Sequence, residues 1–169
     1  FYLCTGLTSI DLGNSVTSIG NYAFYNCTSL TSITIPDSVT TIGSSAFTKC
    51  TSLTSITVDA NNNSFSSDIS GVLFNKNQST LIQYPSNTAT SYTIPDSVTT
   101  IGEWAFYECS GLTSIDIHDS VTTIGEGAFG YCSSLTSIHL GNSLTTIGER
   151  AFSNCTGLNS LDLSGAQVE

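Results

Sequence analysis

Residues 7–29 read LTSIDLGNSVTSIGNYAFYNCTS, and residues 30–52 read LTSITIPDSVTTIGSSAFTKCTS. The same unit begins again at Ala89, Leu112 and Leu135, and its opening returns at Leu158. The cysteines keep the same 23-residue period in two triplets, which are Cys4, Cys27 and Cys50, then Cys109, Cys132 and Cys155. Self-similarity at one fixed period is the signature of a solenoid, in which each unit forms one coil.

The opening of each unit has the alternation of a strand. In the second unit Leu30, Ile33 and Ile35 point to one side and Thr34 points to the other. Alternation with a period of two, carried by β-branched residues, predicts a β-strand. A turn at Pro-Asp or Gly-Asn follows this strand.

The second half of each unit reads V-T-T-I-G and then A-F-x-x-C. We expect the A-F-x-x-C segment to form a short helical turn. Glu103, Glu126 and Glu149 directly follow the glycine, where a negative charge favours the start of such a turn. The unit therefore predicts an α/β repeat solenoid, with strands on one side and short helical turns or irregular segments on the other.

Each unit turns about eight apolar side chains inward, and a single coil cannot bury them. Neighbouring coils must stack on one continuous core, with their strands in a parallel sheet at about 4.8 Å spacing. Residues 1–169 are then one repeat array. The chain opens inside a unit and ends just after a strand, so we expect both ends to be truncated within a larger array, with uncapped ends that could self-associate.

One unit is longer than the others. The cysteine period breaks between Cys50 and Cys109, which leaves a unit of 36 residues at positions 53–88. Its centre, GVLFNKNQSTLIQYP at residues 71–85, holds two apolar runs around Asn-Lys-Asn-Gln and predicts a β-hairpin or a two-strand excursion. The long unit is either a rim of a binding face or a spacer that adjusts the curvature of the stack.

The consensus L-x-x-I-x-I-P-x-S-V-T-x-I-G-x-x-A-F-x-x-C closely resembles the BspA-like, or Treponema pallidum-type, leucine-rich repeats. The resemblance runs through nearly the whole chain and includes the long unit. It implies a right-handed curved stack with a parallel concave sheet. It also implies a cell-surface or secreted protein that binds an extracellular or cell-surface protein, as in adhesion. The family brings no catalytic residues to carry over.

Composition excludes several partners. Thirteen acidic residues stand against three basic ones, for a formal net charge of −10. Nucleic acids and anionic membranes attract clustered Lys and Arg, which this chain lacks. No apolar run approaches the roughly 18 residues of a membrane-spanning helix, so we expect no membrane insertion.

The outward position between the two inward Ile residues of each strand forms the candidate binding face. In successive coils this position holds Asp11, Thr34, Thr57, Thr93, Asp116, His139 and Asp162, and His118 lies diagonal to His139. His139 would lie between two carboxylates, which favours its protonated form below neutral pH. This patch could bind a ligand, bind a cation or sense pH, or it could be an ordinary solvated face.

The cysteines and the single tryptophan also admit two interpretations. The cysteine column lies beside the Phe column on the inward face, which favours free core thiols over disulfides. We expect no metal site, because no C-x2-C pair is present. Trp104 either contacts a partner or packs over the neighbouring coil. Four N-x-S/T sequons, at Asn26, Asn62, Asn77 and Asn154, are acceptors only in a eukaryotic secretory source.

We therefore expect a non-catalytic protein-binding module, with its ligand on the concave strand face and no cofactor. The alternative is a structural spacer or self-assembling element without a specific ligand. An enzyme is disfavoured, because nothing in the sequence assembles a base, a nucleophile and an oxyanion site.

Overall fold

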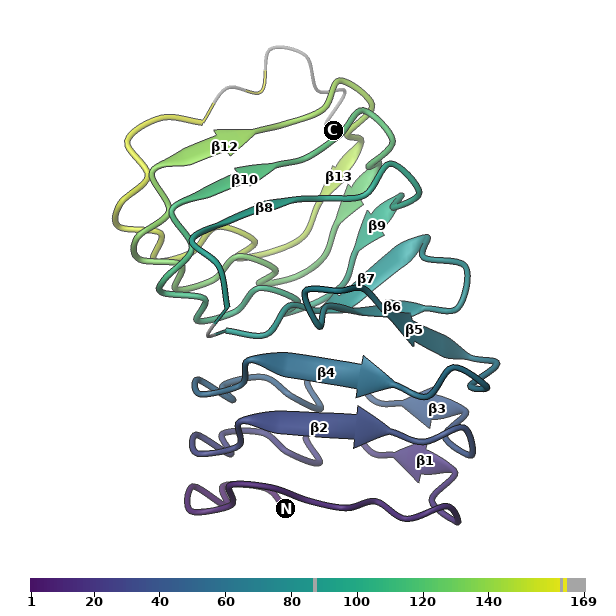
Figure 1. The fold of residues 1–169 in the computed structure, drawn as a ribbon. Coiled ribbons are helices and arrows are strands. Elements are labelled where there is room, and N and C mark those ends of the chain that lie inside the picture. The colour runs from purple at the N-terminus through teal and green to yellow at the C-terminus, as the bar shows by residue number, and fades with distance from the viewer. Residues whose placement is uncertain (87, 162, 164–169) are drawn as a thin grey trace.

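A computed structural model describes residues 1–86, 88–161 and 163, which form a β-solenoid (Figure 1). One side of the coils carries β2 (Ser32–Ile35), β4 (Ser55–Val58), β8 (Ser91–Thr93), β10 (Ser114–Asp116) and β12 (Ser137–His139). The other side carries β1 (Ser18–Ile19), β3 (Thr41–Ile42), β9 (Thr100–Ile101), β11 (Thr123–Ile124) and β13 (Thr146–Ile147). The long unit adds β5 (Phe65–Ser67), β6 (Leu73–Asn75) and β7 (Thr80–Gln83).

The predicted parallel stacking is confirmed. Strand β2 pairs with β4 in parallel, and β8, β10 and β12 form a parallel sheet in the same way. The register joins Ile33 to Ile56 and Ile115 to Ile138, which are residues one repeat apart. Each inward Ile therefore stacks on the equivalent side chain of the next coil, as a repeat of constant length requires.

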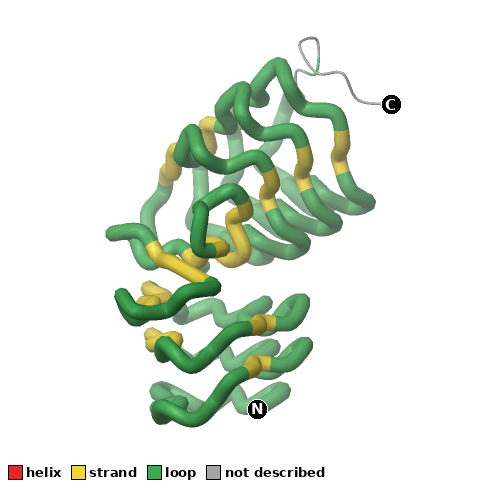
Figure 2. Tube along the Cα trace, turned by 90° about the vertical axis from the view of Figure 1, so that its right-hand side faces the viewer, coloured by secondary structure: helices red, strands yellow, loops and turns green. Residues whose placement is uncertain are grey.

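The predicted helical turn is wrong. Among the described residues there is no helix, and the A-F-x-x-C segment consists of successive β-turns (Figure 2). In the first full unit Ala23 N–H donates to Gly20 O and Cys27 N–H donates to Phe24 O, while Tyr22 and Asn26 have positive φ. The acidic residues that follow the glycine in later units therefore start a turn and not a helix.

A helix does not form because the amides of this segment have partners in the next coil. The N–H groups of Tyr22, Phe24 and Asn26 donate to carbonyls 22 residues later, at 3.1, 2.8 and 2.9 Å. Positive φ at alternate turns directs these groups along the stack, where they cannot make the i to i−4 bonds of a helix. The same segment recurs in later coils and forms a hydrogen-bond ladder, here called the turn ladder.

The hairpin predicted in the long unit is confirmed. Strand β6 pairs antiparallel with β5 and with β7, and β7 pairs in parallel with β9 of the next regular coil. The hairpin thus enters the sheet of β9, β11 and β13 and supplies its first strands.

Two separate hydrophobic cores lie on either side of this hairpin. The N-terminal core runs from Ile19 to Leu73, and the C-terminal core runs from Val72 to Cys155. Adjacent residues of β6 pack into different cores, Leu73 into the N-terminal core and Phe74 into the C-terminal core. Both side chains are completely buried. This arrangement favours the spacer interpretation of the long unit over the rim interpretation.

The coils therefore form an N-terminal stack that carries β1–β4 and a C-terminal stack that carries β8–β13, with the hairpin between them (Figure 1). The coils of the second stack are inclined to those of the first (Figure 2). Within the described residues, no helix is long and apolar enough to cross a membrane.

Candidate functional site

The outward residues of the C-terminal stack line up as the sequence predicted. In the parallel sheet Thr93 pairs with Asp116, and Asp116 pairs with His139. All three side chains are exposed, because they alternate along their strands with Ile, Tyr and Leu side chains that point inward. The structure thus brings three of the predicted residues into one row, here called the strand-face row.

Both histidines of this face are held by a carboxylate. His139 Nδ1 lies 2.9 Å from Asp116 Oδ1, and His118 Nδ1 lies 3.1 Å from Asp96 Oδ1. Asp96 is a member of this face that the sequence pattern did not single out, because it lies in the turn after β8 and not on the strand. In each pair the bond to Nδ1 leaves Nε2 free to face a ligand.

This geometry suits recognition better than catalysis. Among the described residues, no serine hydroxyl or cysteine thiol hydrogen-bonds to either histidine, and no group of three metal-binding side chains is present. Two imidazoles and two carboxylates at a solvated surface can donate and accept hydrogen bonds and can pair with charges. They do not form the nucleophile–base arrangement of covalent catalysis.

The predicted row is not continuous through the chain. Thr34 pairs with Thr57 in the N-terminal stack, but β4 and β8 belong to different sheets, because the long unit lies between them. Thr34 lines a shallow pocket of about 310 Å³ together with Asp11, whose Oδ1 accepts a hydrogen bond from Gly13 N–H at 2.8 Å. Asp162 lies outside the described residues.

One residue beside the row was missed by the sequence analysis. Ile69 is fully exposed, at the turn between β5 and β6. Its neighbour Asp68 accepts a hydrogen bond from the Tyr92 hydroxyl at 2.7 Å, which ties this turn to β8. Burial and this bond raise the pKa of Tyr92 well above its ordinary value. The only sequence signal was an isolated apolar residue in a polar turn, which is common and uninformative by itself.

The cysteines are free thiols, as expected, and five of the six are buried. Cys50 and Cys132 donate their S–H groups to the carbonyls of Phe24 and Phe106, each at 3.1 Å. Burial raises the pKa of Cys50 and of Cys109 to about 12. These thiols are protonated near neutral pH and act as small apolar core groups.

Trp104 packs over the neighbouring coil. A Cβ added at Gly127 would lie 2.1 Å from the indole ring, so the absence of a side chain there makes room for it. The indole also makes an edge contact with Tyr107, with ring centroids 5.2 Å apart. Of the sequons, Asn62 is completely buried and is therefore a structural residue.

Comparison with known proteins agrees with the architecture. A family model described as the BspA type leucine rich repeat region, in six copies, matches residues 1–91 and 82–168. No curated protein matches the sequence at a significant level.

Solved structures of bacterial repeat proteins are similar over most of the chain. A leucine rich cell surface protein of Faecalibacterium prausnitzii is 37% identical over 96% of this chain and 43% of its own, with a TM-score of 0.88. A leucine-rich repeat protein of Eubacterium ventriosum is 35% identical over 95% of this chain and 41% of its own, with a TM-score of 0.85. The pneumococcal vaccine antigen PcpA is 27% identical over 88% of this chain and 42% of its own, with a TM-score of 0.78. The chain thus spans less than half the length of these structures.

Proposed function

The chain belongs to the family of BspA-type leucine-rich repeat proteins, and from that premise we propose that it is a non-catalytic protein-binding module of a cell-surface or secreted protein. The ligand docks on the exposed face of β8, β10 and β12. The observation that carries this proposal is the strand-face row, in which Thr93, Asp116 and His139 are held in fixed register and exposed.

The energetics of this face favour a protein ligand. The row lies on paired strands whose inward residues pack into the C-terminal core, so the backbone under it keeps its position when a ligand arrives. Preorganised polar groups lose little conformational entropy on binding. Ile69, fully exposed in the turn that Asp68 ties to Tyr92 of β8, adds an apolar contact of the kind that polar groups surround in protein interfaces.

The similar structures support the proposed location at the cell surface or outside the cell. One similar structure is named a cell surface protein and another a vaccine antigen, which fits molecules that face the outside of a bacterium. The low Lys and Arg content argues against a nucleic-acid partner.

Biolayer interferometry of the protein against a panel of extracellular-matrix and cell-surface proteins, and against itself, tests the proposal. We expect a saturable interaction that weakens at least tenfold when Asp116 and His139 are both replaced by alanine. The matched control replaces Ser110 and Ser133, which are exposed on the turn side of the same C-terminal stack, by alanine.

Three results would contradict the proposal. Equal weakening by both double variants would indicate a general loss of fold. Unchanged binding in D116A/H139A would exclude the strand-face row. Self-association without any other ligand would favour a structural spacer instead.

A further inference from the structure

The turn ladder is interrupted where the long unit lies. In regular coils the N–H groups of Trp104, Phe106 and Glu108 donate to carbonyls of the next coil at 2.9, 2.7 and 2.8 Å. The equivalent residues in the coil before the long unit are Ser45, Phe47 and Lys49. Among the described residues, no group accepts a hydrogen bond from their backbone amides. Three donors at alternate positions are thus left as an open edge.

The other side of the interruption is also incomplete. Tyr84 of the long unit donates its N–H to Ala105 O at 2.8 Å, which occupies the central position of the ladder. Within the described part of the chain, the carbonyls of Glu103 and Tyr107 accept no backbone hydrogen bond, although the equivalent carbonyls of Glu126 and Gly130 do. Pro85 follows Tyr84 and has no N–H to continue the ladder.

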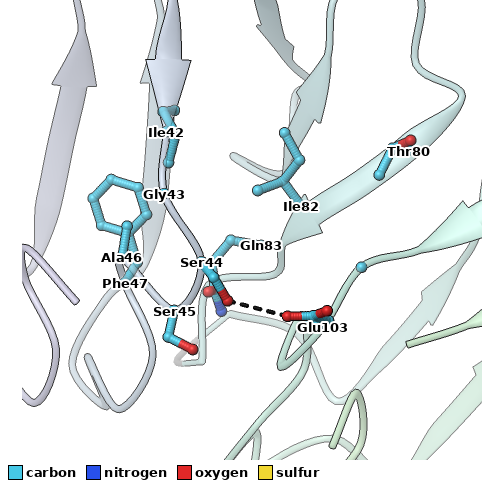
Figure 3. Close-up of a pocket in the computed structure, with 11 residues that line it drawn as sticks. Ile42, Gly43, Ser44, Ser45, Ala46, Phe47, Thr80, Ile82, Gln83 and Glu103 are labelled. Carbon is cyan, nitrogen blue, oxygen red and sulfur yellow. Dashed lines mark hydrogen bonds between the residues drawn. The ribbon is translucent and has the colours of Figure 1, made fainter. Parts of the chain in front are cut away.

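A cleft with an apolar floor separates these two edges (Figure 3). Its volume is about 190 Å³, and its walls are the segment that carries Ile42 and Phe47 and the strand that carries Ile82. The aromatic column that runs along the stack is interrupted at the same place. Phe24 stacks on Phe47 at 5.5 Å and Tyr84 stacks on Phe106 at 4.8 Å, while no stacking contact joins Phe47 to Tyr84 among the described residues.

A second pocket of about 190 Å³ opens beside the first, lined by Tyr22, Tyr25, Thr48, Trp104 and Tyr107 among others. Thr48 is 2% exposed, and its hydroxyl has no hydrogen-bond partner. A buried hydroxyl without a partner destabilises the fold, and a ligand that places a polar group in this pocket would give it one. The site therefore has an unsatisfied polar group independent of the open ladder edge.

Side chains now bridge the cleft at its rim. Ser44 donates its hydroxyl to Glu103 Oε2 at 3.1 Å, and Lys49 Nζ lies 3.0 Å from Glu108 Oε1. The Lys49 ammonium also lies over the rings of Tyr25 and Tyr107, 5.9 and 5.5 Å from their centroids. The hydrogen bond to Glu108 raises the pKa of Lys49 above its ordinary value, so the ammonium stays charged. Two aromatic rings and a carboxylate thus form a cation cage that this lysine fills.

We propose that this cleft binds a peptide segment with a lysine or arginine near its centre. The peptide's carbonyls accept hydrogen bonds from the amides of Ser45, Phe47 and Lys49, as the carbonyls of the next coil do for the equivalent amides in regular coils. Its cationic side chain replaces the Lys49 ammonium against Glu108 and the two tyrosines. Three free backbone donors in a row call for carbonyl acceptors, which a polypeptide backbone supplies, and the carboxylates of Glu103 and Glu108 at the rim favour a basic peptide. This site lies on the turn side, away from the strand-face row, and goes beyond the proposed function.

Amide NMR on the whole chain tests the proposal with a defined probe, acetyl-Ser-Val-Thr-Lys-Thr-Val-Ser-amide, titrated to millimolar concentration. Before peptide is added, the amides of Ser45, Phe47 and Lys49 are expected to exchange with solvent much faster than those of Gly127, Phe129 and Tyr131, their counterparts in a regular coil. Peptide is expected to shift and protect the first three amides. The same peptide with glutamate in place of lysine is expected to bind at least tenfold more weakly.

Two variants with opposite effects sharpen the test. Lys49→Ala empties the cage and is expected to tighten peptide binding at least threefold, whereas Glu108→Gln is expected to weaken it at least fivefold. Glu149→Gln, exposed on the turn side of the last described coil, is the matched control and should leave binding unchanged. A merely structural role for Lys49 predicts weaker binding in K49A. That result, equal exchange of the two amide sets, or no peptide shift at the three amides would each overturn the proposal.

Discussion

The regular coils and the long unit bury their apolar side chains in different ways. A regular coil buries its apolar residues against two identical neighbours, with parallel strands in a register of one repeat. The long unit instead folds back on itself as an antiparallel hairpin and turns one side to each core. Uniform repeats give one continuous core, while a single aberrant unit divides the stack and opens an edge in the turn ladder. The candidate peptide site exists because of that difference.

The largest loss of stability is expected when either of two adjacent hairpin residues, which pack into different cores, is replaced. Phe74→Ala should cost about 3–5 kcal/mol and Leu73→Ala about 2–5 kcal/mol, because both side chains are completely buried. Chemical denaturation gives the size of each loss, and hydrogen exchange gives its location. We expect F74A to destabilise the C-terminal stack first and L73A the N-terminal stack first. Uniform destabilisation by both would mean that the two cores unfold as one unit.

A smaller effect is expected at Asn62, which begins the departure from the regular coil. Its Nδ2 donates to Pro36 O and Val39 O at 2.7 and 2.9 Å, and its Oδ1 accepts from the amides of Ser64 and Phe65 at 2.8 Å. Asn62→Ala leaves these buried groups without partners and should cost about 3 kcal/mol in urea unfolding.

Asn61→Ala serves as the control for this prediction, because Asn61 is exposed and adjacent in sequence. We expect a change below about 0.5 kcal/mol for it. Similar losses for both variants would contradict the assignment of Asn62 as the residue that fixes where the chain departs from the regular coil.

The hydrogen bond that links the long unit to the C-terminal stack should contribute less to the free energy of unfolding. Tyr92→Phe removes the bond from the Tyr92 hydroxyl to Asp68, and a hydrogen bond to a charged group stabilises by about 1.5–3 kcal/mol. We expect a loss of stability at the lower end of this range, because Asp68 keeps its hydrogen bond from the Val72 amide at 2.8 Å. Thermal unfolding of Y92F measures the loss, with Tyr131→Phe, exposed on the turn side, as its control.

The smallest effect on stability is expected in the strand-face row. His139→Gln and Asp116→Asn should each change the free energy of unfolding by less than about 0.5 kcal/mol, because this pair is exposed to solvent. Calorimetry measures the change, and ligand binding by the same variants is expected to fall. A loss of stability as large as that of Y92F would mean that the row is structural and not a binding face.

The repeat of 23 residues was enough to predict the parallel stacking, the inward Leu, Ile, Val, Phe and Cys columns and the hairpin at residues 71–85. These features follow from period and hydrophobic alternation, which are local properties of the chain. The row of Thr93, Asp116 and His139 could also be predicted from the sequence, because a constant repeat length places equivalent residues side by side.

The helical turn was predicted wrongly because A-F-x-x-C has the spacing of one helical turn. The amides of the segment instead find acceptors in the next coil, and only the neighbouring coil reveals this competition. The prediction of one continuous row was also wrong, because the row breaks between Thr57 and Thr93, where the long unit packs between the two sheets.

Sequence alone therefore determined the coil, its period and its inward face, because these arise from contacts between residues at equivalent positions. Tertiary structure alone decided the two cores, the pairing of His118 with Asp96 and the open edge at Ser45, Phe47 and Lys49. Those features depend on which backbone groups remain unpaired when a unit of different length meets regular neighbours. No pattern within a single unit encodes that outcome.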